Sequence, residues 1–270
     1  MLRRMLDRVP SRHREIAIQL LQESLGLGTG WDAKRGGAGV AAALLKWDEV
    51  EAPVIFDVGA NKGQFAMSVR EVLAKDGVVH SFEPSRSAAE AYLQLLGDDS
   101  RFILHRHALG LNDGNAVLYA DQPGSELGSM TRRDTSTHGI EHGSIEEHVT
   151  VRSLDNIMDE LNLQTIDLLK IDVEGHEWDV LKGATRTFDS RRIGMVQFEF
   201  GGANVDTRTF FRDLFRFFSL HHFAICRIIS AKRLYRIHRY TDRLEQFRCA
   251  NYLAIHEARM DRVSQHLRLS

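Results

Sequence analysis

The sequence predicts an α/β fold with a mostly parallel sheet and helices on both of its faces. From Pro53 onward, short apolar runs typical of buried strands alternate with amphipathic runs of helical period, and Gly and Pro stand at many of the boundaries. Strands and helices that alternate in this way form right-handed βαβ units, which build a parallel sheet. After residue 220, apolar strands follow one another closely and predict a terminal hairpin.

The first fifty residues precede this pattern. Ile and Leu recur near helical spacing over 11–25, a glycine-rich connector follows over 25–39, and an Ala/Leu run over 40–47 predicts a second helix. We expect an N-terminal helical cap that covers the sheet or shapes the mouth of a site. The predicted division of the chain is a cap, a main domain and a C-terminal tail, at residues 1–50, 51–258 and 259–270.

The elements of the main domain follow in chain order. Strands are predicted at residues 54–58, 77–83, 101–109, 165–173, 193–200, 223–229, 233–240 and 249–257. Helices are predicted at residues 64–75, 85–96, 153–161, 176–184 and 207–218. Between them, 116–120 could form an edge strand, and the polar, turn-rich segment 121–148 is long enough to be a functional loop. We expect this loop to be mobile without ligand and to close over a bound substrate.

Composition narrows the functional classes. The 270 residues are 43% hydrophobic and 27% charged, which is typical of a globular protein. The formal net charge of -2 argues against general nucleic-acid binding. No apolar run is long enough to span a membrane, no signal peptide is recognisable, and the two cysteines form no metal or disulfide motif. We expect a soluble, cytoplasmic protein without nucleic-acid partners.

The first predicted strand ends in a glycine turn, within the run VIFDVGANKGQFA. Such a turn places backbone N–H groups at the carboxyl edge of the sheet, where ligands bind in open α/β folds, and Gly59 and Gly63 keep it tight. A dinucleotide fingerprint needs a glycine where this chain has Asn61, which disfavours a pyrophosphate ligand. Glu83 ends the second strand and can accept hydrogen bonds from the hydroxyls of a ribose. Together these features indicate an adenosine-type cofactor.

Ionisable residues gather at the ends of two later strands. Asp172, Glu174 and His176 crowd the turn within LLKIDVEGHE, and Glu199 ends the next strand. Three acids and an imidazole at neighbouring strand ends would repel one another unless they serve a proton, a metal or a polar substrate. We assign Glu177, by contrast, to the first turn of a helix, where its charge would stabilise the helix dipole.

These runs resemble one known family. The segments FDVGANKGQF, HSFEPS, RSLDNI, LLKIDVEGHEWDVLKGA and NYLAI are similar to those of the FkbM-type methyltransferases, which depend on S-adenosylmethionine, and the resemblance covers residues 53–256. It implies a class I methyltransferase (Rossmann-like) fold, a seven-stranded sheet whose last strand is antiparallel. It also implies O-methylation of a hydroxyl on a sugar, glycolipid, polyketide or similar small molecule.

The resemblance also implies roles for individual residues. By position, the methionine end of the cofactor would contact Asp57, Gly59, Asn61 and Gly63. Its ribose would contact Glu83. Asp172 would lie near the sulfonium and the acceptor.

The activation of the acceptor hydroxyl is open at this point. We predict that Asp172, Glu174, His176 and Glu199 act together on it. Either His176 takes the proton, or the three carboxylates supply oxygen ligands suited to Mg²⁺, which would lower the pKa of the hydroxyl.

Two other functions share part of this pattern, and the acceptor itself is unidentified. A nicotinamide-dependent oxidoreductase would use the same first turn and Glu83, and a non-catalytic adenosine-cofactor-binding module would not need the acidic cluster. Between residues 207 and 248, ten Lys or Arg face three acids. This run is either a solvated surface or a basic mouth that steers an anionic acceptor.

Overall fold

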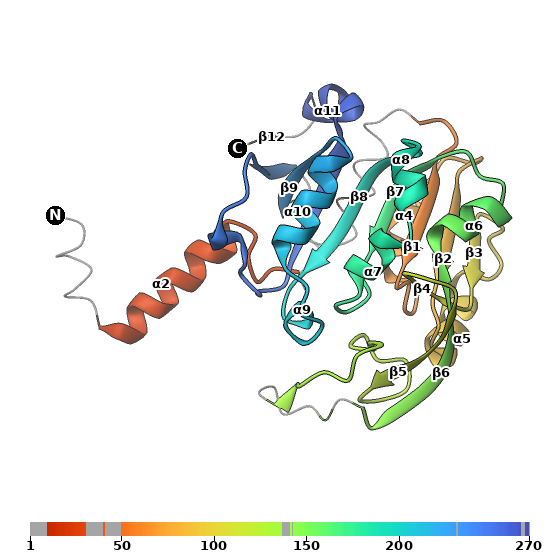
Figure 1. Cartoon of the computed structure of the whole chain (residues 1–270), viewed down its shortest axis with the longest axis horizontal. Helices are drawn as coiled ribbons and strands as arrows, with labels where there is room; N and C mark the ends of the chain where they lie inside the picture. Colours follow the sequence, from red (N-terminus) through yellow and green to blue (C-terminus); the bar gives the residue numbers. More distant parts are fainter. Residues whose placement is uncertain are drawn as a thin grey trace.

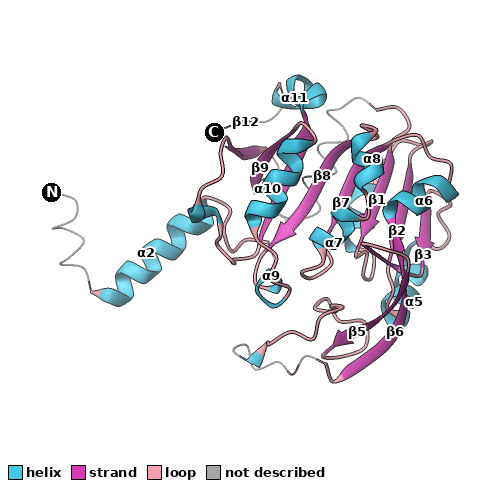
Figure 2. Ribbon diagram, in the orientation of Figure 1, coloured by secondary structure: helices cyan, strands magenta, loops and turns pink. Residues whose placement is uncertain are grey.

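The structure is a computed structural model, and it describes residues 10–30, 40, 50–136, 141, 143–230, 232–265 and 268–269. In Figures 1 and 2 a large twisted sheet is flanked by helices, and a smaller curved sheet lies below its carboxyl edge. The large sheet has nine strands and the smaller one has three. The predicted α/β class is therefore confirmed.

The large sheet has the strand order β3-β2-β1-β7-β8-β11-β9-β10-β12. Its strands are β1 (Val54–Val58), β2 (Val78–Phe82), β3 (Phe102–His105), β7 (Ile166–Ile171), β8 (Ile193–Phe200), β9 (Phe223–Ser230), β10 (Arg233–Ile237), β11 (Ala250–His256) and β12 (Arg268–Leu269). The neighbours from β3 to β8 pair in parallel, whereas β11 is antiparallel to both β8 and β9. Seven consecutive strands thus form the predicted class I sheet with its antiparallel last strand. The predicted hairpin adds β10, and β12 extends the edge beyond it.

Helices cover both faces of this sheet. One face carries α4 (Gln64–Arg70), α5 (Arg86–Leu96) and α11 (Glu257–Ser264), and the other carries α6 (Leu154–Glu160), α7 (Glu177–Lys182), α8 (Thr185–Asp189) and α10 (Phe211–Leu220). Because side chains alternate along a strand, Ile55 packs into the core on the first face and Phe56 into the core on the second. A one-turn helix, α9 (Ala203–Asp206), precedes α10. Ser153 caps α6 by accepting a hydrogen bond from the Asn156 N–H.

The smaller sheet differs from the prediction. It consists of β4 (Ala108–Gly110), β5 (Gly114–Ala120) and β6 (Ile145–Ser153), with β6 in the centre. The single strand predicted at 101–109 is wrong, because the chain leaves the large sheet after His105 and begins the small sheet at Ala108. The predicted edge strand at 116–120 exists as β5, and the predicted loop ends early, because its last residues already pair with β5 as part of β6.

The two ends of the chain differ in how they pack against the main fold. Helix α2 (Ser11–Ser24) has no buried residue and projects away from the sheet in Figure 1, so the helix itself does not cover the sheet. The connector after it does pack, since Leu27 and Thr29 are buried. The helix predicted at 40–47 lies outside the described residues, apart from Val40.

The boundary predicted at residue 258 falls inside α11. The side chains of Met260 and Val263 are buried against the sheet, so this part of the chain belongs to the main fold. In the part of the chain that the structure describes, no helix has both the length and the apolar character required to cross a bilayer.

Candidate active site

A cavity of about 630 Å³ opens at the carboxyl ends of β1, β2, β7 and β8. The ends of these strands form one side, and residues from β5, β6 and the segment between them form the other. Its volume is typical of a small-molecule site, and its position is the one where parallel α/β sheets bind ligands.

The glycine turn after β1 forms part of the wall. Gly59 has φ +76°, and a Cβ atom there would lie 1.8 Å from the carbonyl oxygen of Asp172. Only glycine therefore allows the ends of β1 and β7 to approach each other so closely. Asn61 also has positive φ, and its Nδ2 donates to the carbonyl of Ser125 at 3.1 Å. The structure places both Gly59 and Asn61 in the cavity wall.

Glu83 lies in the wall at the end of β2 and is only 6% exposed. Its Oε2 accepts the N–H of Asn61 and its Oε1 accepts the N–H of Ser85, each at 2.8 Å. Burial raises the pKa of this carboxyl to about 7, although the two hydrogen bonds act in the opposite direction. Each carboxylate oxygen keeps a second lone pair for a ligand hydroxyl.

Two residues that the resemblance assigned to the cofactor lie behind the described wall. Gly63 faces α5, where an added Cβ would meet the ring of Tyr92 at 3.1 Å, so its glycine serves close packing. Asp57 is fully buried and paired with Lys170, whose Nζ lies 3.1 Å from its Oδ1. Neither Gly63 nor Asp57 is part of the described cavity wall.

Lys170 reaches the wall in their place. Its Nζ also donates to the carbonyl of Gly59 at 2.9 Å and lies 3.6 Å from Oδ2 of Asp172. One buried ammonium group thus joins the end of β1, the glycine turn and the end of β7. Lys170 was not among the predicted site residues, although a lone Lys inside the apolar run LLKI is a signal that could have identified it.

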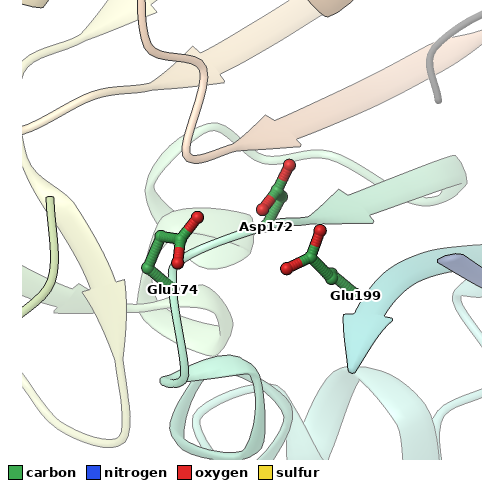
Figure 3. Close-up of side chains that lie close together, drawn as sticks. All are labelled: Asp172, Glu174 and Glu199. Carbon is green, nitrogen blue, oxygen red and sulfur yellow. The ribbon is translucent and has the colours of Figure 1, made fainter. Parts of the chain in front are cut away.

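Three acids converge at the other end of the cavity, and we call Asp172, Glu174 and Glu199 the carboxylate cluster. Each offers an oxygen atom that lies within 4.8 Å of those of the other two. Figure 3 shows the three side chains pointing toward a common space from the turn after β7 and the end of β8. The predicted proximity of these residues is therefore observed.

Two members of the cluster also pair with residues outside the described wall. Glu174 is paired with the guanidinium of Arg133, and Glu199 accepts a hydrogen bond from the thiol of Cys249 at 3.0 Å. Burial raises the pKa of Glu174 to about 8, and the charge of Asp172 adds to the effect. Burial also raises the pKa of Glu199, again with the neighbouring carboxylates acting in the same direction. The cluster can therefore hold a proton near neutral pH.

The turn that presents the cluster is held by Glu177. This carboxylate is buried and accepts the N–H groups of Val173 and Gly175 at 3.2 and 3.1 Å and the side-chain amide of Asn204 at 3.0 Å. Its role is therefore structural, as expected, but it organises a buried turn and is not a solvated charge at a helix end.

His176 does not lie in the described wall of the cavity. Its Nδ1 lies 2.9 Å from Oδ2 of Asp179 and its Nε2 lies 3.0 Å from the hydroxyl of Thr131. Both ring nitrogens thus have protein partners. The structure brings together three of the four predicted catalytic residues and leaves His176 outside the group.

Residues 121–135, which we call the roof segment, cross the cavity. At one end the carbonyl of Ser125 accepts from Asn61 in the glycine turn, and at the other the Ser129 hydroxyl donates to the carbonyl of Glu174 at 2.8 Å. The segment therefore contacts both the glycine turn and the carboxylate cluster.

The N-terminal connector contributes Gly30 to the wall. A Cβ atom at Gly30 would lie 2.0 Å from Sγ of Cys249, so glycine lets the connector pass close to the carboxylate cluster. This contact agrees with the second role considered for the N-terminal residues, the shaping of a substrate mouth. The basic run does not contribute in the same way. The described wall includes none of its ten cations, Arg208, Arg212, Arg216, Arg227, Lys232, Arg233, Arg236, Arg239, Arg243 and Arg248.

Comparisons with known proteins add relatives to this geometry. The chain is 29% identical over 151 residues to the 2-O-methyltransferase NoeI of Sinorhizobium fredii. The match covers 52% of this chain and 61% of NoeI. It is 27% identical over 173 residues to the hexuronic acid methyltransferase AglP of Haloferax volcanii, 62% of this chain and 64% of AglP. The chain thus spans less than two thirds of the length of either relative.

The crystal structure of the O-methyltransferase TomG of Streptomyces achromogenes superposes with a TM-score of 0.43 at 14% identity, over 81% of this chain and 79% of TomG. A family model described as the methyltransferase FkbM domain matches residues 57–236, which is well over half of the chain. The chain therefore belongs to the FkbM family of methyltransferases.

Proposed function

We propose that the protein is an S-adenosylmethionine-dependent O-methyltransferase that acts on a hydroxyl group of a sugar, a glycan or a similar small molecule. The observation that carries the proposal is one cavity with the glycine turn and Glu83 at one end and the carboxylate cluster at the other. The similarity to NoeI and AglP, a 2-O-methyltransferase and a hexuronic acid methyltransferase, supports a sugar acceptor.

The first end of the cavity fits the cofactor. Glu83 would accept the ribose hydroxyls, and the backbone of Gly59 and Asn61 would face the methionine portion. Asp57 would act indirectly, because it holds Lys170 and thereby the turn. When bound, S-adenosylmethionine supplies an activated methyl group on a sulfonium.

The carboxylate cluster would then prepare the acceptor. Its free oxygens can accept the hydroxyl proton of the acceptor and hold its oxygen in line with the methyl group. While the acceptor oxygen takes up the methyl group, a carboxylate of the cluster would accept the hydroxyl proton and later release it to solvent. Alignment of this kind lowers the free-energy barrier by about 7–11 kcal/mol. Proton transfer to a positioned base raises the rate by a further factor of about 10²–10⁴.

The same three oxygens form a donor set of the type that Mg²⁺ prefers. Two of the three ligands already have cationic neighbours, since Arg133 pairs with Glu174 and Lys170 lies 3.6 Å from Asp172. These charges compensate much of what a metal would compensate, so we favour transfer without a metal. Treatment with EDTA should leave turnover unchanged, whereas loss of turnover that Mg²⁺ restores would assign the cluster to a metal.

The cofactor is tested by calorimetry with S-adenosylhomocysteine. Glu83→Gln should weaken binding by about 1.5–3 kcal/mol, the range for a hydrogen bond to a charged group. The matched control is Glu90→Gln, at an exposed position in the same wall, which should bind normally. Unchanged affinity in Glu83→Gln would remove this residue from the cofactor site.

Two further measurements separate the other functions. Binding of NAD in place of S-adenosylhomocysteine would favour the oxidoreductase. Tight binding of S-adenosylhomocysteine without methyl transfer to any member of a broad glycoside panel would favour the non-catalytic module.

A further inference from the structure

The acceptor end of the cavity presents mainly hydrogen-bond acceptors to a ligand. We define this end as the carboxylate cluster together with Gln197 and Asn251, all of which line the cavity. The side-chain amide of Asn251 donates one N–H to the carbonyl of Gly30 at 3.4 Å. Carboxylate oxygens therefore dominate this end, and the amides of Gln197 and Asn251 are its described side-chain amide donors.

Gln197 gives an independent indication of a ligand. It is only 3% exposed, and among the described residues its Oε1 has no hydrogen-bond partner. It lies two residues before Glu199 on β8 and in register with Lys170 on β7, so all three side chains lie on one face of the sheet. A buried amide oxygen without a partner costs about 1–3 kcal/mol unless a donor reaches it. A ligand with O–H groups would supply that donor.

The charges of the wall point in the same direction. Its described acids are Glu83, Glu90, Glu126, Glu146, Glu147, Asp172, Glu174 and Glu199, and its described cations are Arg86 and Lys170. Lys170 is engaged with Asp57 and the carbonyl of Gly59, and the side chain of Arg86 is exposed and paired with Glu90. The wall therefore has no cation available for an anionic group beside the cluster.

We propose that the acceptor is an uncharged, hydroxyl-rich molecule such as a neutral glycoside, and that this end of the cavity rejects acceptors with a carboxylate or phosphate next to the hydroxyl to be methylated. The proposal rests on the proposed function and refines its substrate class. Hydroxyl groups can donate to Gln197 and to the cluster, whereas a carboxylate or phosphate offers only acceptors and carries the same charge. It also replaces the anionic acceptor that the basic run suggested, because that run does not reach the wall.

The first test does not require the natural acceptor. Sinefungin carries an ammonium group where the methylated sulfonium would be, and S-adenosylhomocysteine is uncharged there. If the cluster makes this position negative, sinefungin should bind at least about 10-fold more tightly than S-adenosylhomocysteine, because the ammonium group is attracted by the carboxylates. The advantage should shrink several-fold in Asp172→Asn and persist in Glu71→Gln, whose exposed position at the C-terminal end of α4 is not part of the described wall.

The second test uses matched acceptors. Methyl glucoside, galactoside and mannoside are compared with the corresponding methyl uronosides, which differ in a carboxylate at C6, by transfer of a labelled methyl group. Only the neutral glycosides should be methylated, and Asp172→Asn should narrow the difference in rate between glycosides and uronosides.

The outcomes are distinguishable. Equal affinity for the two analogues, or methylation of uronosides as fast as of glycosides, would overturn the acceptor class and leave the proposed function intact. A protein that binds neither analogue would overturn both.

Discussion

Lys170→Met should destabilise the protein by about 3–5 kcal/mol, the usual cost of leaving one partner of a buried ion pair without the other. The ammonium group lies 3.1 Å from Asp57, a carboxyl whose side chain is fully buried. Methionine keeps the apolar stem of the lysine but removes the charge. The variant therefore isolates the electrostatic contribution of Lys170.

The magnitude follows from the geometry. At an effective dielectric constant of about 20, two unit charges 3.1 Å apart attract by about 5 kcal/mol. The hydrogen bond to the carbonyl of Gly59 adds about 1 kcal/mol. Burying the ammonium group costs several kcal/mol in the native protein, and Lys170→Met removes that cost. The net loss of stability therefore falls toward the lower end of the range of about 3–5 kcal/mol.

Urea unfolding of three variants tests this reasoning. Adding Asp57→Asn to Lys170→Met removes the orphaned charge and should recover at least half of the loss. Lys182→Met provides the control, since its pair with Asp179 at 2.8 Å is partly exposed and should contribute no more than about 1 kcal/mol. A loss below about 1 kcal/mol in Lys170→Met, or a double variant no more stable than the single one, would refute the account.

Three further expectations concern the turn, the response to acid and the proposed base. Gly59→Ala should lower the free energy of unfolding by more than about 2 kcal/mol and abolish binding of S-adenosylhomocysteine, because the residue has φ +76° and its Cβ would overlap a backbone oxygen. Chemical unfolding measures the stability and calorimetry measures the binding. Wild-type values in both would contradict the close approach of the two backbones. Burial lowers the pKa values of His80 and His105 from 6.5 to about 4, so the unfolded chain binds more protons and stability should fall as pH drops from about 6.5 to 4, by up to about 3 kcal/mol for each group. His105→Gln should flatten that slope and the exposed His148→Gln should not, and identical slopes would exclude the histidine pair as the cause. His176→Ala should lower kcat by less than about 10-fold, since its two ring nitrogens have protein partners, and a fall of about 10²–10⁴ in single-turnover rates would instead restore it as the base.

Much of the main fold could be predicted because its parallel strands are buried on both faces. Such strands read as continuous apolar runs, and β8 was predicted with its observed bounds, Ile193–Phe200. The same logic brought Glu83, Asp172 and Glu199 to one cavity, because the carboxyl ends of parallel strands share one edge of the sheet.

The parts that could not be predicted depend on contacts between distant segments. Strand β6 contains Glu146, Glu147 and His148 and resembles a polar loop until it pairs with β5. The position of His176 depends on Thr131, 45 residues away, whose hydroxyl is hydrogen-bonded to Nε2 of the imidazole. The packing role of Gly63 depends on the position of the Tyr92 ring on α5. Local sequence carries no information about any of these partners.

The roof segment has a consequence for the order of events during turnover. Ser125 ties it to the glycine turn and Ser129 ties it to the turn that carries Glu174, so the same stretch of chain contacts both ends of the cavity. If this segment moves away so that S-adenosylhomocysteine can leave, the part of the cavity that would hold the methyl acceptor is also disturbed. We therefore expect the two substrates not to exchange independently. Steady-state kinetics should show a compulsory order, with the nucleoside entering first and leaving last.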